Sequence, residues 1–345
     1  MNNDIYIKFL SVNDLADIDL WNNLVGAQSL PAQALFDWKS SIDSIFFAQS
    51  FAILALNQEK KACGFSLLFI SERDSTLWST RFGFFATNQI VAETLFNEVK
   101  IIASRYNIQQ CNITSGHINF NFLNPPIIKY SLSLPLIYSS ERELWASIPH
   151  KTRNMIRKAE KTGVQITYNW KLLNEFYDLY VNRSLEKSLG IKPLTYFHAL
   201  KNIFGDKAIF IGAVDNNILV AGMIFVSTHN IATYLHNASI VSSKYNGVNN
   251  LIMWQAMQFF YFKKIKYIDL SESSPKSTVF QFKKSLSNDI KTNYIYYYQV
   301  KFCAGNFLVL SINFFKRITH TLMLKLPNCY KKTYLSYLGR RGRVL

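Results

Sequence analysis

The stretch FAILALNQEKKACGFSLLFI (residues 51–70) decides the fold, because a second copy of its pattern occurs later in the chain. The copy is IFIGAVDNNILVAGMIFVS (residues 209–227), and an ungapped alignment places Gly64 on Gly222. Each copy reads as an apolar strand, a polar turn and a second apolar strand, which is the pattern of a β-hairpin. The sequence therefore predicts two related hairpins.

The resemblance continues beyond the hairpins. About 40 residues later each copy has a long apolar helical stretch followed by a short strand, namely VAETLFNEVKIIASRY with CNIT and NNLIMWQAMQFFYFKK with YIDLS. This repeated order predicts a duplicated unit of the α+β type, in which a largely antiparallel sheet carries helices on its faces. We divide the chain after a proline-interrupted segment into residues 1–140, residues 141–300 and a tail of residues 301–345.

The charge is uneven. The chain of 345 residues has a net charge of +16, of which nine charges come from the tail, where no Asp or Glu occurs. Residues 147–163, SIPHKTRNMIRKAEKTG, contribute five basic side chains and one acid, or four net charges. The rest of the chain therefore carries about +3, and two local basic features predict contacts with anions.

The sequence does not indicate a disulfide-bonded secreted protein, a metalloprotein or a membrane-spanning protein. The four cysteines are far apart and lie mostly among apolar residues, so we expect free thiols in a reducing compartment and a cytoplasmic protein. The six histidines have no metal-site spacing, and we expect no metal. No signal peptide is apparent, and the apolar runs are shorter than a membrane span of about 20 residues.

The basic stretch predicts a helix that begins near Pro149 and ends at Gly163. Arg153, Arg157 and Lys161 recur every four residues and share one face. Guanidinium groups bind phosphate oxygens in pairs, so this face is a candidate phosphate clamp. The alternative is a solvated face of an amphipathic helix.

A second candidate is YIDLSESSPKSTVFQFKKSL (residues 267–286). It places Asp269 and Glu272 at the end of a strand, before a Ser/Pro loop that leads to Phe282 and Lys283. A desolvated lysine stabilises a developing oxyanion, and a carboxylate accepts a proton from an attacking amine. The alternative is a solvated turn in which Asp269 only caps the loop.

A third candidate is TYLHNASIVSSKYNGVNNLIMW (residues 233–254). We expect a strand, a glycine-containing loop and a helix that begins near Asn249 or Asn250. Free amides at the start of that helix would hold a phosphate or a carbonyl. A glycine-containing loop before a helix is common.

These segments follow one another in a familiar order. The series TRNMIRKAEKTGVQI, VAGMIFV, YLHNAS, NNLIMWQAMQFF, YIDLSESS and FQFKKSL resembles the FemAB-like branch of the GNAT superfamily, which includes BioF2-type acetyltransferase domains. The resemblance covers roughly residues 145–298. It implies tandem GNAT-like domains, with an acyl-transfer site in or beside the second.

The resemblance also implies roles. It places the family's Phe-Lys pair on Phe282 and Lys283, with Asp269 and Glu272 beside the catalytic lysine and with Tyr234 and Asn237 as substrate-binding residues. The donor phosphates would meet the residues of the basic helix and of the glycine loop: Arg153, Arg157, Lys244, Gly247, Asn249 and Asn250. In such folds a bulged strand opens the sheet for the donor, and we expect this strand at the Gly222 segment.

The activity implied is transfer of an acyl group, with acyl-CoA as the expected donor, to an amine of a sugar or cell-envelope polysaccharide precursor. Two alternatives stay open: a tRNA-dependent aminoacyltransferase of the peptidoglycan-bridge type, and a non-catalytic basic module that binds a membrane surface or RNA. The tail, with Tyr330, Tyr334 and Tyr337, would contact an anionic membrane or tRNA. The alternative is a C-terminal helix packed on the second domain, followed by a frayed cationic end. We expect no DNA partner, and a cytoplasmic location at the inner face of the membrane.

Overall fold

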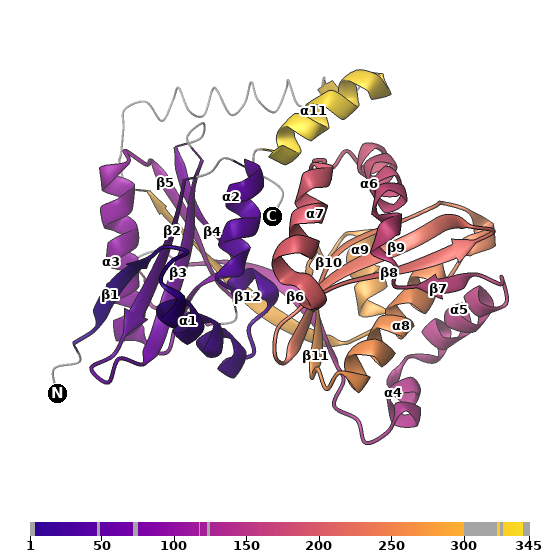
Figure 1. Ribbon diagram of the computed structural model, residues 1–345, viewed down its shortest axis with the longest axis horizontal. Coiled ribbons are helices and arrows are strands. Elements are labelled where there is room, and N and C mark those ends of the chain that lie inside the picture. Colours follow the sequence, from indigo (N-terminus) through magenta and orange to yellow (C-terminus); the bar gives the residue numbers. More distant parts are fainter. Residues whose placement is uncertain are drawn as a thin grey trace.

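The computed structural model in Figure 1 describes residues 4–46, 49–71, 75–116, 118–122, 125–299, 323–324 and 327–340. The first half consists of β1 (Tyr6–Leu10), α1 (Leu15–Ala27), α2 (Asp37–Phe46), β2 (Gln49–Leu56), β3 (Ala62–Ser71), β4 (Thr76–Ala86), α3 (Gln89–Arg105) and β5 (Gln110–Gly116). The linking segment consists of β6 (Ile127–Pro135), α4 (Glu141–Ser147) and α5 (His150–Glu160). The second half consists of β7 (Gln165–Thr167), α6 (Leu173–Lys187), α7 (Leu194–Phe204), β8 (Ala208–Asp215), β9 (Ile218–Ser227), β10 (Ile231–Ser239), α8 (Val248–Phe262), β11 (Tyr267–Glu272) and α9 (Thr278–Lys284). β12 (Asp289–Gln299) and α11 (Asn328–Arg340) follow.

The two predicted hairpins are present, and they organise two equivalent halves. β2 and β3 pair antiparallel, as do β8 and β9. In each half the next strand then forms a parallel pair with the strand after the long helix, β4 with β5 and β10 with β11. The prediction of a duplicated α+β unit is confirmed.

All the strands join into one mixed sheet in the order β1-β2-β3-β4-β5-β12-β6-β11-β10-β9-β8-β7. The middle of this order shows an exchange. β12, which follows the second half in sequence, pairs with β5 of the first half, while β6, which follows the first half, pairs with β11 of the second half. Neither half of the sheet is therefore complete without a strand from the other side. The domain boundaries at residues 140 and 300 stay a prediction.

Hydrophobic clusters cover both faces of the sheet. One lies under α3, and another lies between the sheet and α5 and α8. A third is shared by the two halves, because α1 and α2 pack on the same cluster as α6 and α7. Figure 1 shows α2 and α7 facing one another between the halves, and the rings of Trp38 and Phe204 lie 5.6 Å apart.

Part of the tail packs as a helix. In α11, Leu335 is fully buried against Val181 of α6 and Ile191. The Ile191 amide donates a hydrogen bond of 2.9 Å to the Leu335 carbonyl. Residues 301–322, 325–326 and 341–345 lie outside the described residues, and so does most of the basic tail that was predicted to contact a membrane or tRNA.

The glycine loop differs in detail from the prediction. α8 begins at Val248, and Gly247 is its N-cap with φ +96°. The basic helix α5 begins at His150, with Pro149 as its N-cap, and ends at Glu160, with Lys161 as its C-cap, so Gly163 lies beyond the helix end that it was expected to cap. A Cβ atom at Gly247 would lie 2.3 Å from the Met155 carbonyl oxygen of α5, so this glycine allows α5 and the start of α8 to touch.

We expect Gly247→Ala to lower the free energy of unfolding by about 2–4 kcal/mol, because it combines a strained backbone with a clash against main-chain atoms. Urea unfolding followed by circular dichroism measures the loss. Gly163→Ala is the matched control, since Gly163 also has a positive φ of +80° but no atom within 4 Å of the added Cβ. Equal losses for the two variants would contradict the importance of the contact between α5 and α8.

Candidate functional site

A cavity of about 1220 Å³ lies between the two halves of the molecule. It is lined by β4 and β5 on one side, and by β10, β11, α9 and the segment between α6 and α7 on the other. Four predicted site residues line it: Tyr234, Asn237, Glu272 and Lys283. The structure therefore brings together predicted residues of two separate segments, although the predicted catalytic Asp269 and the predicted substrate-binding Phe282 are not part of the lining.

The sheet opens at this cavity because β10 and β11 diverge. Their parallel pairing ends at Thr233 and Asp269, and the β9–β10 ladder then shifts register between Tyr234 and His236. The Gly222 segment was expected to form this opening as a bulged strand. Its ladder with β8 does shift register, between Ala221 and Leu219, but the strands that part at the cavity are β10 and β11. Gly222 pairs regularly with Gly212 and Ala238, and it leaves room for the aromatic rings of the core instead.

β11 has a bulge of its own. Its register with β6 shifts between Asp269 and Glu272, and Ser271 has φ +60°, a left-handed conformation that costs a residue with a side chain free energy. The Ser271 hydroxyl donates a hydrogen bond of 2.9 Å to the Tyr234 carbonyl, which ties the bulge to β10. The bulge presents two successive carbonyl groups, of Ser271 and Glu272, to the same atom.

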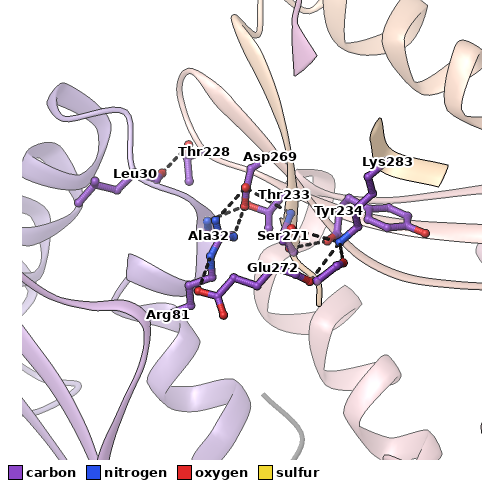
Figure 2. A network of polar contacts seen from close by, with 11 residues as sticks. Leu30, Ala32, Arg81, Thr228, Thr233, Tyr234, Asp269, Ser271, Glu272 and Lys283 are labelled. Carbon is purple, nitrogen blue, oxygen red and sulfur yellow. Dashed lines mark hydrogen bonds and ion pairs between the residues drawn. The ribbon is translucent and has the colours of Figure 1, made fainter. Parts of the chain in front are cut away.

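That atom is Nζ of Lys283, which is brought to the cavity by the short helix α9. Nζ donates to the carbonyl oxygens of Ser271 at 3.1 Å and Glu272 at 3.2 Å, and to Oγ of Ser273 at 2.6 Å. It lies 5.9 Å from the centre of the Tyr234 ring. Figure 2 shows the side chains of Lys283 and Tyr234 beside one another. The side chain is only 3% exposed, and burial lowers the pKa of Lys283 to about 8.

The two predicted carboxylates have different partners. The two oxygens of Asp269 accept hydrogen bonds from the two terminal nitrogens of the Arg81 guanidinium group, one of them at 2.9 Å. Glu272 lies 3.7 Å from Arg81 Nε and 3.8 Å from Lys129 Nζ, and its Oε1 atom is buried without a hydrogen bond among the described residues. Asp269 is therefore held by two hydrogen bonds, whereas the Glu272 side chain lines the cavity and has only the two longer ion pairs in the described part of the chain.

Sequence reasoning missed Arg81. It comes from β4 of the first half and reaches β11 of the second half (Figure 2). The signal that could have found it is a lone charge inside an otherwise uncharged strand, TLWSTRFGFF (residues 76–85). A buried charge is costly unless it has a partner, so a lone charge in such a strand indicates one elsewhere in the chain.

Sequence reasoning also missed Lys192, which lines the cavity and is 4% exposed. Its Nζ atom lies 4.6 Å from the centre of the Tyr196 ring, and the structure shows no ion pair for it among the described residues. Burial lowers the pKa of Lys192 to about 7. Burial and the charge of Lys192 also hold the pKa of neighbouring His236 well below its ordinary value, and His236 lies 3.2 Å from the Tyr196 hydroxyl.

The predicted phosphate-binding residues form a separate group outside the lining of this cavity. Arg153 and Arg157 lie on α5, and Gly247 brings α5 against the start of α8. The Arg157 guanidinium lies 5.5 Å from the centre of the Trp145 ring, whereas the Arg153 Nε atom is buried without a hydrogen-bond partner in the described structure. The helix that carries the two arginines therefore touches the start of α8, through the Met155 backbone and Gly247.

The other members of that group already have protein partners. Lys244 and Tyr245 both contact the carboxylate of Asp215. The Asn249 side chain accepts a hydrogen bond of 3.2 Å from Asn237 and donates one of 3.1 Å to Ser239. The remaining predicted residues are Asn250, which lies in the first turn of α8, and Phe282, which packs partly buried on the second-half core.

Other predictions concern the chain as a whole. Among the described residues, Cys63 and Cys111 are buried and free, as predicted, and burial raises the pKa of Cys111 to about 12. No helix within the described ranges has the length and apolar character needed to cross a bilayer. The same ranges contain no cluster of three or more His, Cys, Asp or Glu side chains placed to hold a metal ion.

Comparison with known proteins agrees with the fold. Residues 126–216, from the end of the first half to β8, match the model of the FemAB family. The fold is FemAB-like and of the tandem GNAT type. No curated protein sequence matches the chain.

Solved structures show the same FemAB-like architecture. The crystal structure of FemX superposes with a TM-score of 0.60 at 11% identity, covering 83% of this chain and 96% of that one. A tandem GNAT protein from the clavulanic acid biosynthesis pathway gives 0.55 at 10% identity, covering 86% and 99%. A protein of unknown function from Bacteroides thetaiotaomicron gives 0.56 at 12% identity, covering 85% and 99%. At these identities the comparison establishes the fold.

Proposed function

We propose that the protein is an acyltransferase that joins an acyl group to a primary amine in the cavity between its two halves. The observation that carries this proposal is Lys283, a buried lysine held by three oxygen acceptors where the parallel strands β10 and β11 diverge. A cation in a desolvated cleft stabilises the negative oxygen of a tetrahedral intermediate far better than it would in water.

The proposed reaction proceeds by direct attack. The amine nitrogen forms a bond with the acyl carbonyl carbon, and Lys283 stabilises the oxyanion by exchanging its contact with Ser273 Oγ for the developing charge. Glu272, which lines the cavity, accepts the proton of the amine, since both oxygens of Asp269 are hydrogen-bonded to Arg81. The carbon–sulfur or carbon–oxygen bond to the leaving group then breaks, and the leaving group takes the electron pair.

Acyl-CoA is the proposed donor, and an amine of a sugar or cell-envelope precursor is the proposed acceptor. A second candidate, an aminoacyl-tRNA donor, is favoured by the matched FemAB segment and by the basic helix α5, which lies outside the cavity, where a large polyanion has access. In the first case Arg153 and Arg157 would bind the CoA phosphates, and in the second the tRNA backbone.

Thermal unfolding in the presence of candidate donors tests this proposal. A donor that binds the folded state at 100 times its Kd stabilises it by about 2.7 kcal/mol, which raises the melting temperature measurably. We expect CoA thioesters to stabilise the protein, and Arg153→Ala/Arg157→Ala to weaken the effect. Stabilisation by charged tRNA alone, falling steeply with salt, would select the second candidate. No response to either donor class would contradict the proposal.

Lys192 supports an anionic acceptor, because it is buried with no acidic partner in the described structure, and a carboxylate or phosphate of the substrate would stabilise its charge. We expect Lys192→Met to raise KM for the acceptor by about tenfold, with a smaller effect on kcat. Since the pKa of Lys192 is about 7, the free enzyme loses this charge as the pH rises through 7, and acceptor affinity falls in that direction. Initial rates at varied acceptor concentration from pH 6 to pH 9 measure both effects; a KM independent of pH would contradict this role.

A further inference from the structure

Arg81 reaches the second half because β4 is irregular at this position. The β3–β4 ladder pairs Ser66 with Phe84 and then Leu68 with Ser79, so residues 80–83 stand outside the regular register. Phe82 has φ +60°, and the Thr80 hydroxyl anchors the loop by donating a hydrogen bond of 2.9 Å to the Gln33 carbonyl. The irregular segment therefore projects a single arginine toward β11.

The contacts of Arg81 form a short chain that ends at Lys283. The guanidinium group donates hydrogen bonds to both oxygens of Asp269, and Oδ1 of Asp269 also accepts a hydrogen bond of 3.3 Å from the Ser271 amide. Ser271 and Glu272 present the carbonyl groups that hold Lys283 Nζ. Figure 2 shows these groups side by side, with Arg81 entering from the first half and Lys283 from the opposite side.

From this arrangement we propose that Arg81 is a positioning residue. It holds Asp269 and the bulge of β11 in the conformation that presents Lys283 to the substrate, so that catalysis in the second half requires the first half to be docked. This inference rests on the proposed function, and it assigns the first half a part in the site rather than a scaffolding role alone.

The pKa of Lys283 depends on the charges around it, so it can be used to test the role of Arg81 separately from activity. Burial is the main cause of the lowered pKa of Lys283; the positive charge of Arg81 lowers it further, while Asp269 and Glu272 raise it. The remaining neighbours are Lys129, which pairs with Glu272 from β6, and the uncharged Tyr234. Without Arg81, Asp269 is no longer neutralised, so the pKa of Lys283 rises and less of it is neutral at pH 8.

The experiment measures the labelling of Lys283 by an amine-reactive reagent between pH 6 and pH 11, with peptide mass spectrometry, alongside kcat and KM. The wild-type labelling midpoint is expected near the pKa of about 8. Arg81→Gln should move the midpoint up by roughly one pH unit and lower kcat by about tenfold or more, with KM changed less than about threefold. Arg81→Gln/Asp269→Asn, which removes both charges, should return the midpoint toward that of the wild type.

Arg81→Lys separates position from charge. It keeps the charge but cannot grip two carboxylate oxygens, so the midpoint should stay near that of the wild type while kcat falls. An Arg81→Lys protein with wild-type kcat would overturn the positioning role. So would an Arg81→Gln protein that is folded and keeps the wild-type midpoint and kcat.

Thr228→Val and Asn230→Ala are the matched controls. Thr228 donates a hydrogen bond of 3.2 Å to the Leu30 carbonyl, and Asn230 donates one of 3.1 Å to Ser29 Oγ. Each substitution therefore removes a hydrogen bond between the halves that does not involve Lys283. Neither should move the labelling midpoint; an equal shift in a control would show a general effect of docking and overturn the inference. Labelling requires no transfer reaction. A shifted midpoint without any transferase activity would therefore reject the proposed function and retain the electrostatic link between Arg81 and Lys283.

Discussion

Replacing Lys283 with Met should lower kcat for acyl transfer by about 10²–10³-fold, the usual cost of removing one group that stabilises an oxyanion. The reason is the position of Nζ, which is buried at the opening between β10 and β11 and already bonded to three oxygens. Donor binding should persist, because the predicted phosphate-binding residues lie outside the lining of this cavity.

The neighbouring Lys284 provides the matched control, since it is adjacent in sequence but exposed. Lys284→Met should retain kcat within about twofold of the wild type, in keeping with a surface substitution. Single-turnover transfer with preloaded donor measures both variants. Because Lys283 acts as a cation with a pKa of about 8, kcat of the wild type should fall as the pH rises above 8. Equal activities of the two Met variants would contradict the assignment.

The second large effect is on stability. Asp269→Ala should lower the free energy of unfolding by about 3–5 kcal/mol, because it leaves the buried guanidinium group of Arg81 without its carboxylate. The side chains of Arg81 and Asp269 are only 12% and 10% exposed, so solvent cannot replace the lost partner. Urea unfolding at pH 7 measures the loss.

Two comparisons isolate the cause. Arg81→Met/Asp269→Leu, which removes both charges, should recover much of the stability, since an apolar replacement of a buried pair is often neutral. The exposed pair of Lys8 and Asp17 has side chains 50% and 19% exposed, and Asp17→Ala should cost less than about 1 kcal/mol. If Asp269→Ala costs no more than Asp17→Ala, the bond between the halves is not structural.

The fold could be predicted from the sequence largely because it is duplicated. The alignment of Gly64 on Gly222 joins two hairpins that the structure places in equivalent positions, and the apolar patterns of α3 and α8 follow each of them. The exchange of β6 and β12 could not be predicted, since either strand could form backbone hydrogen bonds with the edge strand of either half. Only long-range packing selects between such pairings, and it leaves no local pattern.

The site was predictable only within one segment. Asp269, Glu272 and Lys283 lie close together in sequence, so a strand, a loop and a short helix were enough to group them. Arg81 is 188 residues from Asp269 and meets it only because the halves dock. The opening of the sheet was predicted at the wrong strand for a related reason. The glycine at position 222 drew the prediction to β9, whereas no residue type in β10 signals the register shift after Tyr234.

The formation of an amide product is the direct test of the proposed acyl transfer to a primary amine. The purified protein is incubated with CoA thioesters or aminoacyl-tRNA and a panel of amino sugars and amine-bearing cell-envelope precursors, and products are detected by mass spectrometry. We expect an amide of one acceptor class together with release of the free donor carrier, and no product with Lys283→Met. A folded wild-type protein that forms no amide from either donor class would contradict it.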